Sequence, residues 1–211
     1  MKKYLSVVVF IVMVTGIIFG CKKSNSPKDY AAAVKDKTWW GTLTYPGKSA
    51  EYYSVHFNGD NSLTWSQIAG DYAGQWVLNG KQLTITFTGI SVEIKADISD
   101  DDKLMNITDN TANSEINSGQ LIVNPNISLD NTKWVGVFST MSYQVSFLTG
   151  MKLNTQTSNI DYGPTAYARS ASGAVIRFNT NSVSYVFGVI TSDSIMRGTD
   201  PSNSQWSVGK Q

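Results

Sequence analysis

Few residues of this chain could carry out chemistry, and those few are isolated from one another. His56 is the only histidine and Cys21 the only cysteine among 211 residues. A zinc site needs several histidine or cysteine ligands, and a serine–histidine hydrolase needs a positioned nucleophile, for which no G-x-S-x-G turn is present. Alternation along residues 52–57 (YYSVHF) places His56 opposite the apolar residues of that segment. We therefore expect a solvent-facing histidine without a catalytic role.

Two short acidic or polar runs are the other candidates. Asp100–Asp102 offers carboxylate oxygens that could bind calcium, but it lacks the spaced D-x-[DN]-x-[DN]-G pattern, so we expect a solvated turn. Asp193-Ser194-Ile195 matches a three-residue motif for bacterial O-glycosylation, and an ordinary turn is the alternative. No other constellation of side chains points to a metal, a cofactor or a catalytic site. The sequence therefore predicts a protein that is not an enzyme and has no cofactor.

The composition is that of a folded protein rich in strands and turns. Hydrophobic residues make up 41% of the chain and charged residues 16%, which supports a packed core. The formal net charge is +1. Without Lys2 and Lys3, which lie in a leader segment described next, 15 basic residues stand against 16 acidic ones. This balance leaves no basic surface for a nucleic acid.

Residues 1–20 (MKKYLSVVVFIVMVTGIIFG) have the layout of a signal peptide. Two lysines precede an apolar run, and a small residue, Gly20, precedes Cys21. A transmembrane anchor is the alternative, but it needs about 20 apolar residues, and this run is somewhat short. We therefore expect the segment to be cleaved.

The end of this segment, Ile18-Phe19-Gly20-Cys21, resembles the lipobox of bacterial lipoproteins, with Ile18 where leucine is usual. The resemblance implies cleavage before Cys21 and its acylation with diacylglycerol and an acyl chain such as palmitate. It would also explain a lone cysteine in an exported chain. Lys22 in place of aspartate implies sorting to the outer membrane. No acidic run follows Cys21, which favours the periplasmic face over the cell surface.

The rest of the chain predicts β-structure after a short tether. Residues 21–35 form the tether, with one or two helical turns at most over Tyr30–Lys35. Residues 83–88 (LTITFT) and 92–98 (VEIKADI) alternate apolar and polar residues, which is the period of a half-buried strand. Turn signals such as Asn79-Gly80 punctuate the chain at short intervals. An all-β antiparallel meander is the expected fold class.

An internal duplication divides this meander into two repeats, at residues 36–124 and 130–211. The matches run in order along the chain at an offset near 90 residues, which similar but unrelated meanders would not explain as well. The later matches pair Leu104-Met105 with Ile195-Met196, and residues 120–123 (QLIV) with 205–208 (QWSV). The central matches pair Tyr53, Val55, Phe57 and Leu63 with Tyr143, Val145, Phe147 and Leu153.

Three short motifs give the repeats a family resemblance. They are a leading Trp-x-Gly, a Phe before a Gly-Asp turn at 57–60, and Gly-x-Trp-x-Leu at 74–78. In this order they resemble the small lipocalin-like domains of bacterial lipoproteins. The family usually has Asp-Gly at the turn, and the second repeat lacks the Gly-x-Trp element. The resemblance implies two meandering antiparallel barrels, either closed separately or joined in one larger sheet; we favour two packed modules.

The aromatic residues are the remaining candidates for function. Large aromatics fill barrel cores and also line ligand pockets. Short strands make a barrel shallow, which favours packing over a deep pocket in each repeat. The expected function is non-catalytic binding of a small apolar or carbohydrate ligand, or of an envelope protein; a structural role through protein contacts is the alternative. The candidate ligand-lining residues are Tyr53, Phe57, Trp65 and Trp76.

Overall fold

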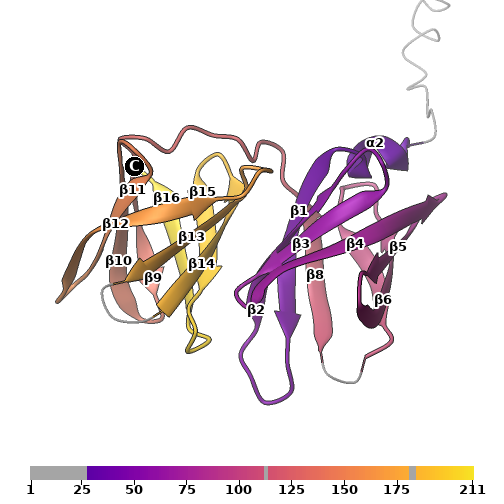
Figure 1. Ribbon diagram of the computed structural model, residues 1–211, viewed down its shortest axis with the longest axis horizontal. Coiled ribbons are helices and arrows are strands. Elements are labelled where there is room, and N and C mark those ends of the chain that lie inside the picture. Colours follow the sequence, from indigo (N-terminus) through magenta and orange to yellow (C-terminus); the bar gives the residue numbers. More distant parts are fainter. Residues whose placement is uncertain (1–27, 112–113, 181–183) are drawn as a thin grey trace, which may run out of the picture.

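The computed structural model describes residues 28–111, 114–180 and 184–211, and it confirms the all-β fold class with two tandem repeats. Each repeat forms its own eight-stranded antiparallel sheet, and the two sheets lie side by side (Figure 1). No helix in the described part of the chain is long and apolar enough to cross a membrane. The prediction of two packed modules is therefore correct, and a single larger sheet is excluded.

The first sheet follows a short helix, α2 (Tyr30–Val34). Its strand order is β7-β6-β5-β4-β3-β2-β1-β8, so β7 and β8 are its two edges. The strands are β1 (Lys37–Thr44), β2 (Glu51–Phe57), β3 (Ser62–Gln67), β4 (Gly70–Asn79), β5 (Gln82–Phe87), β6 (Ile90–Ile98), β7 (Leu104–Asp109) and β8 (Glu115–Leu121).

The second sheet closes into a barrel in the order β10-β11-β12-β13-β14-β15-β16-β9. Its last strand pairs with its first over five residue pairs, from Trp206–Phe138 to Lys210–Trp134. The strands are β9 (Lys133–Phe138), β10 (Met141–Leu148), β11 (Lys152–Thr157), β12 (Asp161–Arg169), β13 (Val175–Thr180), β14 (Ser184–Ser192), β15 (Ile195–Thr199) and β16 (Gln205–Lys210).

The first barrel is joined along only part of the seam between β7 and β8. Within the described residues, the two edges are linked by a bridge between Lys103 and Gln120 and by a backbone hydrogen bond from Leu121 N to Asp102 O (3.1 Å). Both links lie next to the β6–β7 turn. Towards the other end of the barrel, among the described residues, β7 pairs only with β6 and β8 pairs only with β1.

The central part of the predicted duplication is confirmed by register. Leu63 pairs with Phe57 as Leu153 pairs with Phe147. All eight residues of the central matches are at most 3% exposed and point into the two barrels. Alternation identified these inward faces because successive side chains of a strand point to opposite sides of the sheet.

The later matches are displaced. Of the residues matched at β7 and β15, the buried ones are Leu104 and Met196, so the predicted pairing is one residue out. At the last strand the error is four residues, because β8 aligns Gly119 with Gly41 whereas β16 aligns Val208 with Gly136. Turns and bulges change strand length without a visible mark in the sequence.

The glycine of the Trp-x-Gly motif is explained by close backbone approach. A Cβ on Gly41 would lie 1.9 Å from Ser118 O and 2.6 Å from Tyr53 Oη. That space allows Tyr53 to cross the strand and donate to Ser118 O (2.7 Å). Gly136 occupies the same place in the second barrel, where a Cβ would lie 2.0 Å from Ser207 O. The motif therefore serves packing at the β1–β8 and β9–β16 pairs.

Helix α2 closes one end of the first barrel (Figure 1). The Asp29 side chain caps it by accepting from Ala31 N (3.0 Å) and Ala32 N (3.3 Å). Its residue Val34 is fully buried, and Trp39 Nε1 donates to Ala33 O (2.8 Å). The last part of the expected tether is thus packed against the first barrel.

The outer faces of the two barrels pack against each other. A separate apolar cluster joins Tyr52, Trp40 and Ile68 of the first barrel to the buried side chains Val175, Phe187 and Val189 of the second. The face of β2 that carries Tyr52, Ser54 and His56, which was predicted to turn His56 to solvent, is therefore partly covered by the second barrel. Tyr52 is 6% and Ser54 1% exposed. Alternation separates two faces of a strand, but it cannot say that a second barrel covers the outer one.

Candidate functional site

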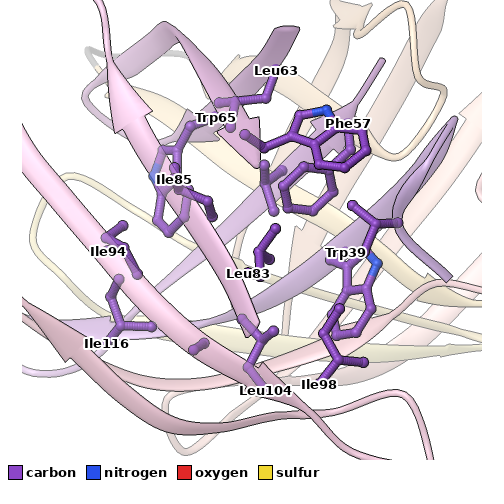
Figure 2. Packing of buried hydrophobic residues seen from close by; sticks show 14 of the residues in the cluster. Trp39, Phe57, Leu63, Trp65, Leu83, Ile85, Ile94, Ile98, Leu104 and Ile116 are labelled. Carbon is purple, nitrogen blue, oxygen red and sulfur yellow. The ribbon is translucent and has the colours of Figure 1, made fainter. Parts of the chain in front are cut away.

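The first barrel contains an apolar pocket at the end opposite α2. We call this end the mouth; it is formed by the β1–β2, β3–β4 and β5–β6 turns and by Thr111 and Ser114 beside β7 and β8. The pocket has a volume of about 250 Å³, and its apolar walls include Leu43, Trp65, Phe87, Ile94 and Ile116. Figure 2 shows Ile94 and Ile116 well apart from Trp39 and Ile98. Trp39 lies at the α2 end, where it donates to Ala33 O.

At the mouth, two wall residues of the first barrel are smaller than their counterparts in the second barrel, whereas Trp65 is larger than its counterpart Thr155. Leu43 pairs with Ile116 across β1 and β8. With Gly41 aligned to Gly136, the corresponding pair in the second barrel is Phe138 and Trp206.

There the larger rings fill the space. Tyr143 lies against Phe138 (5.5 Å between ring centroids) and against Trp206 (5.8 Å), and Phe178 is 6.5 Å from Trp206. Two aliphatic side chains in place of two aromatic ones leave the equivalent end of the first barrel hollow.

The unpaired part of the β7–β8 seam borders this pocket. Asp109 at the end of β7, Thr111 and Ser114 in the connection, and Ile116 at the start of β8 all line it. Because the edges of β7 and β8 are not laddered together here, the seam and the mouth offer a route for a small molecule to enter.

A chain of hydrogen bonds runs along one wall of the pocket. Trp65 Nε1 donates to Gln67 Oε1 (3.0 Å), and Gln67 Nε2 donates to the Tyr45 hydroxyl (2.9 Å). Trp65 is 4% and Gln67 6% exposed. Burial raises the pKa of Tyr45, and the hydrogen bond from Gln67 partly opposes this shift. Tyr45 therefore remains a neutral phenol at physiological pH.

Of the four predicted lining residues, the structure places only Trp65 on the pocket wall. Tyr53 stacks on the inner side of Trp65, with 4.0 Å between ring centroids and 11° between planes. Phe57 and Trp76 form an edge-to-face pair at 5.9 Å, and Trp76 Nε1 donates to Asn58 O (3.1 Å). These three residues belong to the packed core rather than to the pocket.

The residues that sequence reasoning missed are those whose position depends on register across the sheet. Leu43, Ile116 and Tyr45 carry no motif of their own. A bulge between Thr42 and Leu43 sets the pairing of Leu43 with Ile116. Two signals were available: Phe138 stands two residues after Gly136 where Leu43 follows Gly41, and Trp206 has no aromatic counterpart once the last strands are aligned by their contacts with Gly41 and Gly136.

The isolated chemical residues do not converge on the pocket. His56 Nδ1 lies 2.9 Å from the Thr38 hydroxyl, and the residue is half-buried rather than solvent-facing. Burial lowers the pKa of His56, and the charge of Asp36 partly opposes this shift. The histidine thus has a structural partner on the neighbouring strand.

The run Asp100–Asp102 forms the β6–β7 turn, as expected. Asp102 pairs with Lys28 (2.6 Å), Asp101 pairs with Lys103, and Asp100 accepts a hydrogen bond from Tyr30 (3.1 Å). Across the described ranges, no three His, Cys, Asp or Glu residues are grouped so that they could hold a metal. Asp193 and Ser194 form the exposed β14–β15 turn.

A second, polar hollow of about 480 Å³ lies between the barrels. Five serines line it, together with Tyr52, Asn203 and Gln205. Gln205 Nε2 donates across the interface to Ala50 O (2.6 Å). Its hydroxyl-rich wall suits a polar molecule rather than an apolar one.

Cys21 and the predicted signal peptide lie outside the residues that the structure describes. Comparison with known proteins adds no relative: no family model, no curated protein and no solved structure matches this chain.

Proposed function

We propose that this protein is a lipid-anchored envelope lipoprotein whose first barrel binds a small, mostly apolar molecule without chemical conversion. The observation that carries the proposal is the pocket at the mouth, where Leu43 and Ile116 replace the aromatic pair of the second barrel. Concave, apolar sites with a few polar groups are the usual form of small-molecule sites.

The anchor follows from the sequence. Acylation of Cys21 with several chains would hold the protein stably on a membrane, because each buried methylene contributes about 0.8 kcal/mol. Lys22 supports sorting to the outer membrane, with the barrels facing the periplasm. The first barrel would then stand close to the bilayer, since α2 packs on it only a few residues after the anchor.

Two other ligand classes have a weaker structural basis. A carbohydrate would find better partners in the polar hollow between the barrels than in the pocket. A protein partner would use exposed apolar side chains of the second barrel, such as Leu148 (37% exposed) and Met151 (45%) at the β10–β11 turn. Binding of a protein partner would make this protein a structural or accessory component of the envelope.

The test is affinity purification of the full chain from native envelopes, with mass spectrometry of the small molecules and proteins that accompany it. The variant for comparison fills the pocket by Leu43→Phe and Ile116→Trp, which copies the second barrel. The proposal predicts a small molecule on the wild-type protein that the filled variant lacks. A small molecule retained equally by both, or only a stoichiometric protein partner, would reject it.

The anchor has its own test. Metabolic labelling with palmitate should mark the wild-type protein and leave a Cys21→Ala variant unlabelled. Equal labelling of the two would overturn the assignment of Cys21.

A further inference from the structure

The hydrogen bonds on the pocket wall have a fixed direction. An indole N–H can only donate, so the bond from Trp65 Nε1 requires the carbonyl oxygen of Gln67 to face Trp65. The amide nitrogen of Gln67 then faces Tyr45 and donates to its hydroxyl oxygen. The backbone carbonyl of Gln67 is held as well, because it accepts from Arg177 Nη2 of the second barrel (3.1 Å).

This direction determines what Tyr45 can offer. Its hydroxyl accepts from Gln67, and among the described residues no other hydrogen bond involves this hydroxyl. The phenolic proton of Tyr45 is therefore available to an acceptor in the pocket, which Tyr45 lines. A donor in a half-buried apolar site is stabilised when a bound molecule accepts from it.

The charge around the pocket is negative. Asp109 is the only charged residue among those that line it. Its Oδ1 accepts from Thr111 N (2.9 Å) and from the Thr111 hydroxyl (3.1 Å), and neither bond neutralises the carboxylate. Glu51 acts electrostatically on Tyr45 from the next strand, and Lys48 partly offsets the charge of Glu51. These carboxylates would repel a bound anion, and no cation among the lining residues would offset the repulsion.

The volume limits the size of the ligand. An apolar cavity of about 150 Å³ binds benzene. The 250 Å³ of this pocket therefore suit a molecule of about two fused rings or a short branched chain. A long acyl chain would not be enclosed.

We infer that the pocket selects a neutral ligand of about the size of two fused rings, which accepts one hydrogen bond from the Tyr45 hydroxyl. We also infer that it rejects carboxylates of similar size. This inference rests on the proposed function and specifies its ligand class. The class is set by Tyr45 and Asp109, whereas the apolar walls alone would admit any small apolar molecule.

A set of probes built on one indane ring system tests this selection. Indane has no acceptor, 1-indanone adds a carbonyl oxygen, and indane-1-carboxylate adds a negative charge. Each is titrated into the lipidated protein in nanodiscs, with tryptophan fluorescence as the readout and empty nanodiscs as the blank. The variants are Tyr45→Phe and Asp109→Asn, with Tyr185→Phe, at a 65% exposed position, as the matched control.

The expected result has three parts. The ketone binds the wild-type protein about fivefold more tightly than indane, as one neutral hydrogen bond implies, and Tyr45→Phe removes this preference while Tyr185→Phe keeps it. The carboxylate binds the wild-type protein at least tenfold more weakly than the ketone. The Asp109→Asn substitution reduces this difference in affinity.

Equal binding of indane and 1-indanone, or tightest binding of the carboxylate, would overturn the inference and leave the proposed function intact. Absence of saturable binding by every probe would overturn both.

Discussion

Leu43 and Ile116 face each other across β1 and β8 at the place where the second barrel pairs Phe138 with Trp206. The inward faces also differ at Trp65, whose counterpart in the second barrel is the smaller Thr155, so the first barrel keeps its indole on β3 and the second keeps one on β16.

Filling the pocket should stabilise the first barrel. Ile116→Trp places an indole where the second barrel has Trp206, and burial of apolar surface in existing space typically adds about 0.5–2 kcal/mol. Thermal unfolding should show a higher midpoint for Ile116→Trp than for wild type. Val77→Trp, at a 63% exposed position, is the control and should leave the midpoint unchanged. A lower midpoint for Ile116→Trp would mean that the pocket is too small or differently shaped.

Gly41→Ala should destabilise the protein. The new methyl would lie 1.9 Å from Ser118 O, so the strands or Tyr53 must shift. Overpacking of this kind costs about 1–3 kcal/mol, measured as a loss in the free energy of unfolding in urea. Gly209→Ala is the matched control, because its nearest neighbour would be 3.7 Å away. Equal effects of the two substitutions would contradict the packing role of the Trp-x-Gly motif.

Arg177 should couple the two barrels. Its guanidinium bonds Asp71 Oδ1 (2.7 Å) and the carbonyl of Gln67, and it lies 5.3 Å from the centre of the Phe187 ring. Arg177→Ala should lower the unfolding free energy by about 1–2 kcal/mol, because a two-point ion pair and a ring contact are lost together.

The matched control for Arg177→Ala is Lys95→Ala, which breaks an exposed pair with Glu93 within one strand. Exposed pairs of this kind contribute about 0–1 kcal/mol. A loss on Arg177→Ala no larger than that of the control would show that the interface does not depend on Arg177.

His56 should make the protein less stable in mild acid. Its pKa is lowered by burial, so the unfolded chain binds a proton more readily than the folded one. Its contribution is fully present above the unfolded value of about 6.5 and is lost as pH falls from there through the lowered folded value. His56→Gln should reduce the difference in unfolding free energy between pH 7 and pH 5. An unchanged difference would show that the histidine is not the titrating group.

The sequence predicted the fold better than the site because the two depend on different information. Alternation and the recurrence of Tyr53, Val55, Phe57 and Leu63 define which side of a strand is buried, and those residues lie inside. The pocket depends on the pairing of β1 with β8 and on a bulge after Thr42. Contacts between distant strands leave no local pattern, so three of the four candidate lining residues lie in the packed core.

The inter-barrel interface escaped sequence reasoning for a related reason. Tyr52 and Ser54 occupy the polar-looking side of their strand, yet they are buried. What covers that side comes from β13 to β15, far along the chain. A polar face on a strand indicates only that this face does not point into the core of the barrel to which the strand belongs.

A crystal structure of the protein with bromobenzene tests the central claim most directly, because bromine marks its own position by anomalous scattering. The account predicts a bromine site among Leu43, Trp65 and Ile116 at the mouth of the first barrel. The Leu43→Phe, Ile116→Trp variant should lose that site. A bromine inside the second barrel, or none at the mouth of the first, would contradict the account.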